Sequence, residues 1–254
     1  MIRVSASALD ILWSDLRLPG SPAPLAVRSV GETRDERARI RDEVYANLAD
    51  RGLFRGGELD PALRERLELL AHASLVVECE ALIDLSDPEP LRAMAVAANG
   101  RGVLAVQPRR TVALTAIRAG EVFTAAVGVV PEFEAGPGMG VSLPASALDA
   151  LSNAAMEDST SRRARVFEQQ AREALAVQSR PVFAAGQFSI RVRQGAGLHR
   201  IGGVSWFVTD GGGYLGTVTE GRGGETWLSL VPADPARIVV RLTDMYEEVG
   251  LVRR

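Results

Sequence analysis

Hydrophobic residues follow two different periods along this chain. In the first third they recur every three or four positions, a spacing that predicts helices over residues 6–17, 33–52 and 60–72. Thr33, with Glu36 three residues later, forms a capping-box signature, and Asp60 followed by Pro61 is typical of a helix start. The pattern therefore gives these helices a face directed toward the core and defined N-terminal boundaries.

Apolar and polar residues alternate along other segments, which is the spacing of half-buried strands. This pattern predicts strands over residues 74–83, 92–98, 102–107, 111–117, 182–193, 203–209, 213–219 and 225–231, with a turn at Asn99-Gly100 between the second and third of them. Helical patterns recur over residues 119–130, 144–153, 161–178 and 234–249. Consecutive strands with helices at the ends of each run indicate an α+β fold with a mainly antiparallel sheet.

One five-residue sequence occurs twice, as Ala6–Asp10 and as Ala145–Asp149. Each copy follows a short apolar stretch and opens a helical pattern, and similar elements follow in the same order. Chance recurrence in an alanine-rich chain is the alternative. The repeat predicts pseudo-two-fold, duplicated halves, 1–136 and 137–254, which share one sheet and meet at the glycine-rich segment 134–140.

Composition narrows the class of protein. The 254 residues are 46% hydrophobic and 24% charged, with a net charge of −3 and both signs interspersed, so no basic field exists to bind nucleic acid. No segment approaches the length of apolar residues that spans a bilayer, and we expect a cytoplasmic protein. Every basic residue is arginine, which excludes lysine chemistry such as Schiff-base formation or a Walker lysine.

The residues that usually carry chemistry are scattered. His72, at a helix end, and His199, in a glycine-rich turn, lie on different elements without acidic or cysteine partners at metal-ligand spacing. The glycines of Gly211–Gly216 fit a dinucleotide fingerprint, but a strand follows them instead of a helix, so Asp210-Gly211 is predicted to be a hairpin turn. We predict no catalytic, cofactor or metal site.

One cysteine, two glutamates and two tryptophans lie on predicted strands, where a side chain faces either the core or a surface. The lone Cys79 lies in an alternating strand and is predicted to be a buried structural thiol. Glu78 and Glu80 share a strand face, where solvation is the expected role. Trp206 and Trp227 lie on predicted strands and are candidates either for the core or for a protein interface, where tryptophan is enriched.

Several motifs resemble those of the EspG family, the cytosolic chaperones of actinobacterial type VII secretion. They are Val4–Asp10, Arg51–Phe54 with Asp60–Leu63, Gly186–Phe188, Trp206–Tyr214 and Trp227–Asp234. The Trp-Phe-x-Thr-Asp-Gly-Gly run is the most specific of them. Together the similar stretches extend over nearly the whole chain.

The resemblance implies a central antiparallel sheet flanked by two helical bundles, and a function without a cofactor. EspG-like proteins bind PE–PPE heterodimers before secretion and shield the hydrophobic tip of the PPE protein. By this resemblance, the partner-binding residues for a PE–PPE heterodimer or a related helical substrate would be Leu85, Asp87, Arg191, Arg193, Trp206 and Trp227.

Two other classes of function stay open at this stage. The chain could bind or convert a small molecule in a pocket between its halves if Glu78, Glu80, Arg191 and Arg193 converge. It could instead self-associate, as a homodimer, because exposed strand edges can pair.

Overall fold

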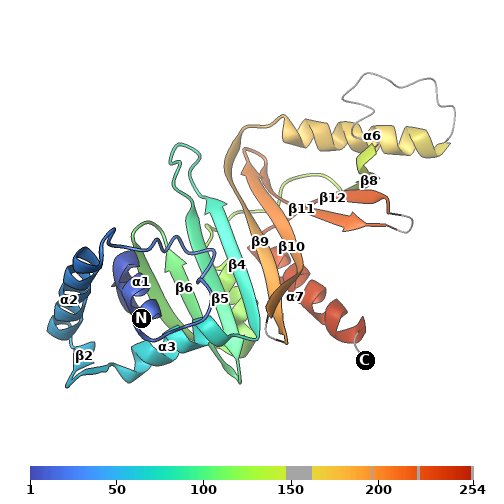
Figure 1. Cartoon of the computed structure of the whole chain (residues 1–254). Helices are drawn as coiled ribbons and strands as arrows, with labels where there is room; N and C mark the ends of the chain where they lie inside the picture. The colour runs from blue at the N-terminus through green and yellow to red at the C-terminus, as the bar shows by residue number, and fades with distance from the viewer. Residues whose placement is uncertain (147–161, 196, 222–223, 253–254) are drawn as a thin grey trace.

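The computed structural model describes residues 1–146, 162–195, 197–221 and 224–252 (Figure 1). Within these residues, ten strands form one sheet in the order β1-β7-β6-β5-β4-β9-β10-β11-β12-β8, and each neighbouring pair is antiparallel. The strands of the first half are β1 (Ile2–Ser5), β4 (Leu75–Leu82), β5 (Leu91–Ala98), β6 (Arg101–Gln107) and β7 (Thr111–Arg118). Those of the second half are β8 (Val141–Pro144), β9 (Val182–Gln194), β10 (Gly197–Thr209), β11 (Gly212–Glu220) and β12 (Thr226–Pro232). The predicted α+β class and antiparallel sheet are confirmed.

Helices precede, follow and interrupt these strands. The N-terminal helices are α1 (Ala6–Asp15), α2 (Arg34–Asp50) and α3 (Pro61–His72), with a small hairpin, β2 (Phe54–Arg55) and β3 (Glu58–Leu59), between the last two. A 3-10 turn, η1 (Ala119–Glu121), leads into α4 (Val122–Val127), and the second half contributes α6 (Arg162–Gln178) and α7 (Pro235–Val252).

The helix starts follow the predicted capping chemistry. The Thr33 Oγ1 accepts a hydrogen bond from the Glu36 amide at 3.1 Å, and the Asp60 Oδ1 accepts one from the Leu63 amide at 3.0 Å. The Glu36 carboxylate accepts from the amide of Glu32, one residue before the cap, instead of closing the box on Thr33 itself. Local sequence therefore sets where α2 and α3 begin.

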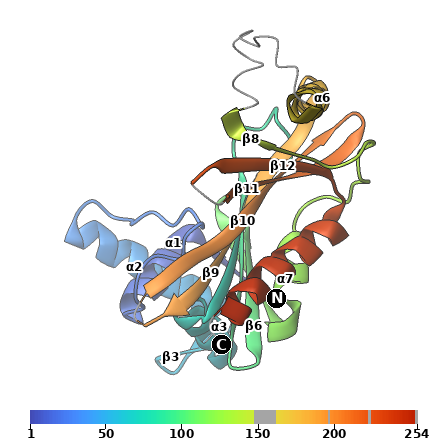
Figure 2. The ribbon, with the colours of Figure 1, turned by 90° about the vertical axis from the view of Figure 1, so that its right-hand side faces the viewer.

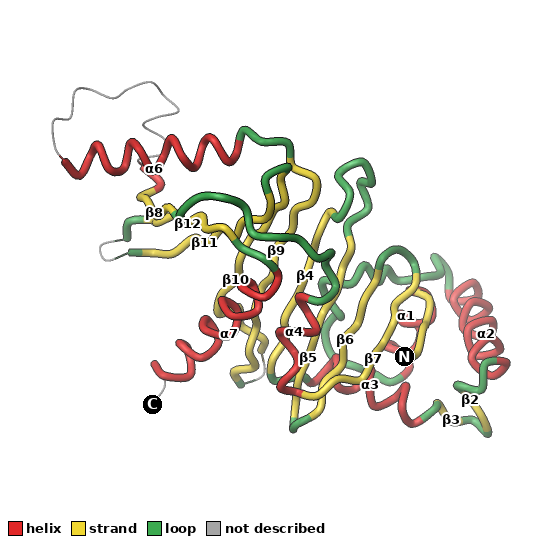
Figure 3. The backbone as a smooth tube through the Cα atoms, turned by 180° about the vertical axis from the view of Figure 1, so that it is seen from behind, coloured by secondary structure: helices red, strands yellow, loops and turns green. Residues whose placement is uncertain are grey.

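The sheet separates two hydrophobic clusters. On one face of the first-half strands, α1 and α3 cover residues such as Val76 and Val96, and α2 packs against α1. On the other face, α4 and α7 cover Val77, Phe188 and Trp206 (Figure 3). The sheet twists strongly along its length, so that β12 and β8 cross the direction of the first-half strands (Figure 2).

Two predicted hairpin turns connect neighbouring strands of the sheet. Asn99 and Gly100, between β5 and β6, both have positive φ, at 50° and 79°, as a two-residue turn of the primed type requires. Asp210 and Gly211 connect β10 to β11, where Thr209 pairs with Gly212. The glycine-rich run is therefore a hairpin within the sheet, as predicted, and no helix follows it.

Some expectations need correction. His199 lies in β10, opposite Val192, and not in a turn, because β10 begins at Gly197, six residues before the predicted start. Its early part carries glycine and exposed polar residues in place of an alternating pattern. The short edge strands β1 and β8 precede the two copies of the repeated pentapeptide; most of the second copy, Ala147–Asp149, lies outside the described residues.

Candidate functional site

Among the described residues, no helix covers one side of the second-half strands between α1–α3 and α6 (Figure 1). Strand register places Glu80, Gln187, Ser205 and Gly216 in one row across this side. Along β9 and β10, these positions alternate with buried residues of the opposite side. We define the open face as the outward residues of the three strands β4, β9 and β10, namely Glu78, Glu80, Leu82, Phe183, Ala185, Gln187, Ser189, Arg191, Arg200, Ser205 and Phe207.

Charged side chains are paired along one end of the open face. The Arg191 Nε lies 2.9 Å from the Glu78 Oε1 but makes no aligned hydrogen bond, so this contact is an ion pair. The Ser189 hydroxyl donates to the other oxygen of Glu78 at 2.6 Å, and Arg92 pairs with Glu80 at 3.3 Å. Partly exposed ion pairs of this kind contribute at most about 1 kcal/mol to the free energy of unfolding. Their main effect is to hold the charged side chains in fixed positions on the open face.

A hollow of about 340 Å³ is lined by Glu78, Glu80, Ser189 and Arg191 together with Arg200, Gln187 and the Ala23–Pro24 segment. Glu78, Glu80 and Arg191 therefore converge, but Arg193 does not. Its guanidinium donates to the carbonyl oxygens of Ala73 at 2.8 Å and Ala71 at 3.1 Å, at the end of α3. Arg193 thus joins α3 to the sheet, and the four-residue convergence that a pocket enzyme would need is not met.

The other end of the open face is apolar. Ala185 lies between Leu82 of β4 and Phe207 of β10, and Phe183 follows on the same side by strand alternation. The Phe183 side chain is 56% exposed, a large value for phenylalanine in a sheet. Phe207 stacks on Tyr214 with their ring centroids 5.6 Å apart, which holds this aromatic end in place.

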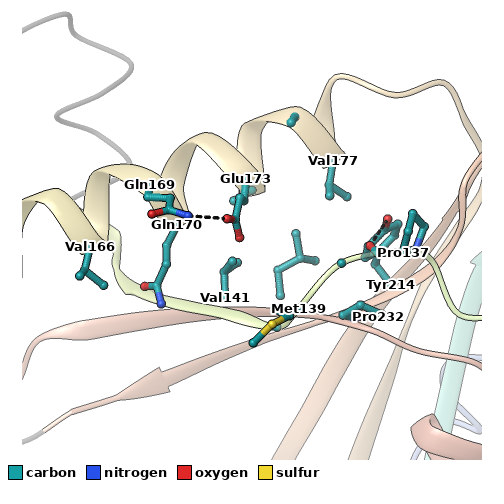
Figure 4. A pocket seen from close by; sticks show the side chains of 15 residues that line it. Pro137, Met139, Val141, Val166, Gln169, Gln170, Glu173, Val177, Tyr214 and Pro232 are labelled. Carbon is teal, nitrogen blue, oxygen red and sulfur yellow. Dashed lines mark hydrogen bonds between the residues drawn. The ribbon is translucent and has the colours of Figure 1, made fainter.

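A groove between α6 and the segment before β8 continues this apolar surface at Tyr214 (Figure 4). Its volume is about 490 Å³, and Val166, Val177 and Leu230 contribute to its walls. Met139 at its edge is 85% exposed. The Tyr214 hydroxyl donates to the Pro137 carbonyl at 3.1 Å, which fixes the loop that forms one wall.

The loop between β4 and β5 carries two predicted contact residues. Leu85 is 46% exposed, and Asp87 pairs with Arg109 at 3.2 Å. The Asp84 carboxylate accepts from the Ser86 hydroxyl at 2.7 Å and from the Ser86 amide at 2.8 Å, and these hydrogen bonds lower the pKa of Asp84. The loop is therefore held by its own hydrogen bonds and presents Leu85 outward.

Both candidate tryptophans lie on the other side of the sheet. Trp206 is 1% exposed and stacks on Phe133 with ring centroids 5.7 Å apart, so its indole belongs to the core under α7. Trp227 is half-buried, and its register opposite Thr219 directs it away from the open face. Neither indole shares a surface with Arg191.

Sequence reasoning missed Phe183, Phe207 and the α6 groove. The alternation of β9 could have shown that Phe183 lies on the side opposite Phe188, but a single phenylalanine near a strand end gives no sign of its exposure. The groove brings α6 and β8 together with Tyr214, Leu230 and Pro232 of β11 and β12, which lie farther along the chain.

The buried side of the sheet holds the only cysteine, Cys79. Its side chain is buried, which confirms the prediction, and burial raises the pKa of the thiol to about 12. Among the described residues, no three His, Cys, Asp or Glu side chains gather where they could hold a metal ion. No described helix is long and apolar enough to cross a membrane.

The fold of this chain is similar to that of a protein of known structure, and its sequence matches a family model. A solved structure of the Mycobacterium tuberculosis type VII secretion system chaperone EspG5, in complex with a PE25-PPE41 dimer, is similar with a TM-score of 0.69 over 94% of this chain and 93% of that chain. The two chains are 14% identical, a level at which the likeness shows a shared fold. No curated protein matches this sequence. The model of the EspG family matches residues 5–244, and the chain therefore belongs to the EspG family.

Proposed function

We propose that this chain is a cytosolic chaperone of an actinobacterial type VII secretion system, which binds a PE–PPE heterodimer or a related helical substrate and keeps it soluble for export. Family membership and the shared fold with a chaperone solved in complex with such a dimer support this role. The observation that carries the proposal on this chain is the open face, where an exposed aromatic end adjoins a row of fixed polar groups.

The two ends of the open face suit two parts of a client. Phe183, Phe207 and the α6 groove provide an apolar area that can cover an exposed hydrophobic helix tip. Arg191, Gln187 and Ser189 provide polar groups for its rim, in the arrangement of an apolar centre and a polar edge that protein interfaces use. No cofactor enters this function, because binding alone shields the client.

The predicted contact residues divide accordingly. Leu85 and Asp87 in the β4–β5 loop and Arg191 on β9 remain in the proposed client surface. Arg193 is engaged by α3, and the two tryptophans serve the opposite side of the sheet, so they leave the proposal. Phe183 and Met139 replace them as the exposed apolar contacts.

We also propose that the two halves, 1–136 and 137–254, are pseudo-repeats within one compact unit. The sheet order supports this, since β1-β7-β6-β5-β4 and β8-β12-β11-β10-β9 list equivalent strands from each edge inward. The central pair, β4 and β9, is antiparallel, as a two-fold axis between equivalent strands requires. Under this two-fold relation, the open face of the second half is equivalent to the side of the first half that α1 and α3 cover.

Co-expression with the PE–PPE pair encoded beside the gene, followed by tagged purification and size-exclusion chromatography, tests the proposal. A stoichiometric complex that keeps the client soluble supports it, and Phe183→Asp should reduce recovery of the complex. Val240→Asp is the matched control, because Val240 is 59% exposed on α7, on the other side of the sheet. A chain that elutes alone while the client precipitates would contradict the proposal, and a client-free dimer would favour self-association.

A further inference from the structure

A second hollow, of about 600 Å³, lies where the segment 26–30 approaches the β4–β5 loop and the β6–β7 turn. Four arginines line it, Arg28, Arg92, Arg109 and Arg110. They come from three separate parts of the chain, in a protein whose net charge is −3. We call this feature the arginine hollow; it is distinct from the hollow of the open face.

Two of the four arginines are already neutralised. Arg92 pairs with Glu80 at 3.3 Å and Arg109 with Asp87 at 3.2 Å. Arg28 and Arg110 are exposed, and neither has an ion pair with any carboxylate in the described ranges of the chain. The hollow therefore contains two guanidinium groups that form no ion pair with the described part of the chain.

The backbone that carries these two arginines is fixed. The buried Gln107 side chain accepts a hydrogen bond from the Ala26 amide at 2.6 Å and donates to the Ala26 carbonyl at 3.3 Å, which holds the segment leading to Arg28. The Arg110 carbonyl accepts from the Ala6 amide at 2.8 Å. Both arginines thus extend from backbone segments that hydrogen bonds already hold, so little backbone ordering is needed when a ligand binds.

We propose that the arginine hollow binds an acidic peptide segment of a second protein, with carboxylates pairing to Arg28 and Arg110. Guanidinium groups match carboxylates in a bidentate geometry. The apolar lining from Val30, Pro88 and Pro90 suits the aliphatic parts of a peptide, and a small inorganic anion would leave it uncovered. Glu89 also lines the hollow, and its carboxylate repels any anion that binds close to it, so we expect the peptide carboxylates to pair with Arg28 and Arg110 and not to lie beside Glu89.

This site goes beyond the proposed client contact, and its test needs no client. The probe is a short fluorescein-labelled peptide rich in Asp and Glu, measured by fluorescence anisotropy against the full chain at low ionic strength. We expect saturable binding that weakens about tenfold or more in the double variant Arg28→Glu/Arg110→Glu. Binding should also weaken as salt is added.

The matched control is Arg34→Glu/Arg39→Glu, which makes the same change of charge at exposed positions on α2. It should retain binding, and an Asn/Gln version of the peptide should not bind. Equal loss in both double variants, or no saturable binding to the unmodified chain, would overturn the proposal. Displacement of the peptide by an equal concentration of inorganic phosphate would also overturn it and assign the hollow to small anions. If the reversal variant does not fold by circular dichroism, Arg28→Gln/Arg110→Gln serves instead.

Discussion

The two sides of β9 and β10 differ sharply although they belong to the same strands. Under α4 and α7, Phe188, Ile190 and Trp206 are fully buried. On the open face, the alternate residues include the exposed Gln187 and Phe183 and the paired Arg191. One side therefore stabilises the fold, while the other keeps both charge and apolar area available for a partner.

The comparison shows that residue type alone does not separate the two roles. Tryptophan is enriched at interfaces, yet Trp206 is core, and Phe183, a residue usually placed inside, is the exposed aromatic. A residue of β9 or β10 is buried if its side chain lies on the side of the sheet that α4 and α7 cover, and it stays available to a partner if it lies on the other side. Substitutions on the two sides should accordingly separate stability from client binding.

The largest effect is expected from Trp206→Ala. Removing a fully buried indole should lower the free energy of unfolding by about 3–5 kcal/mol, because of lost burial and the cavity left behind. Urea denaturation followed by circular dichroism measures it. Trp206→Phe should cost less, since the indole Nε1 has no hydrogen-bond partner to lose. Unchanged stability with loss of client binding would assign Trp206 to the interface after all.

The double variant Glu78→Arg/Arg191→Glu exchanges the two charges of the ion pair. It should weaken client binding more than it changes stability. The pair can re-form with opposite polarity, so we expect stability to change by no more than about 1 kcal/mol. Affinity for the PE–PPE pair should fall about tenfold, or about 1.4 kcal/mol, because the polar pattern of the rim is inverted. Biolayer interferometry on the purified complex partners measures this, and unaltered affinity would remove Arg191 from the client surface.

Cys79 provides a pH test of the buried side. Its thiol pKa is raised from 9.0 to about 12 in the folded chain, so the unfolded state ionises first. Below about pH 9 the thiol is protonated in both states, and it costs the folded state nothing. As pH rises from about 9 toward 12, the thiol ionises only in the unfolded state, and the free energy of unfolding falls by about 1.4 kcal/mol per pH unit. Urea titrations at pH 8 to 10.5 should show a shallower decline for Cys79→Ala. Identical slopes would contradict the buried thiol.

The smallest effect is expected at the N-terminus of α2, away from both sides of the central strands. Thr33→Ala removes the hydroxyl that accepts from the Glu36 amide, which should cost about 1 kcal/mol of stability. Thr33→Ser should restore most of it. Client affinity should not change in either variant, and a change would show that α2 contributes to binding.

Much of the fold followed from local patterns. Thr33 and Asp60 marked helix starts, Asn99-Gly100 and Asp210-Gly211 marked hairpins, and alternation located the strands of the central sheet. These features depend on residues close in sequence, so periodicity and capping chemistry are sufficient. The early part of β10 was missed because its glycines and exposed polar residues do not alternate.

The site was less predictable. Arg193 and Arg191 are two residues apart on one strand face, yet one bonds to the end of α3 and the other pairs with Glu78. Only the packing of α3 against the sheet distinguishes them. The α6 groove and the arginine hollow likewise combine segments that are distant in sequence, and no spacing along the chain indicates them.

Site-specific photo-crosslinking would test the central claim most directly. A benzoylphenylalanine in place of Gln187, on the open face, and another in place of Val240, on α7, would each be irradiated in the co-purified complex with the PE–PPE pair. We predict a crosslink to the client from position 187 and none from position 240. A crosslink from 240 alone would place the client on the α7 side and contradict the assignment of the open face.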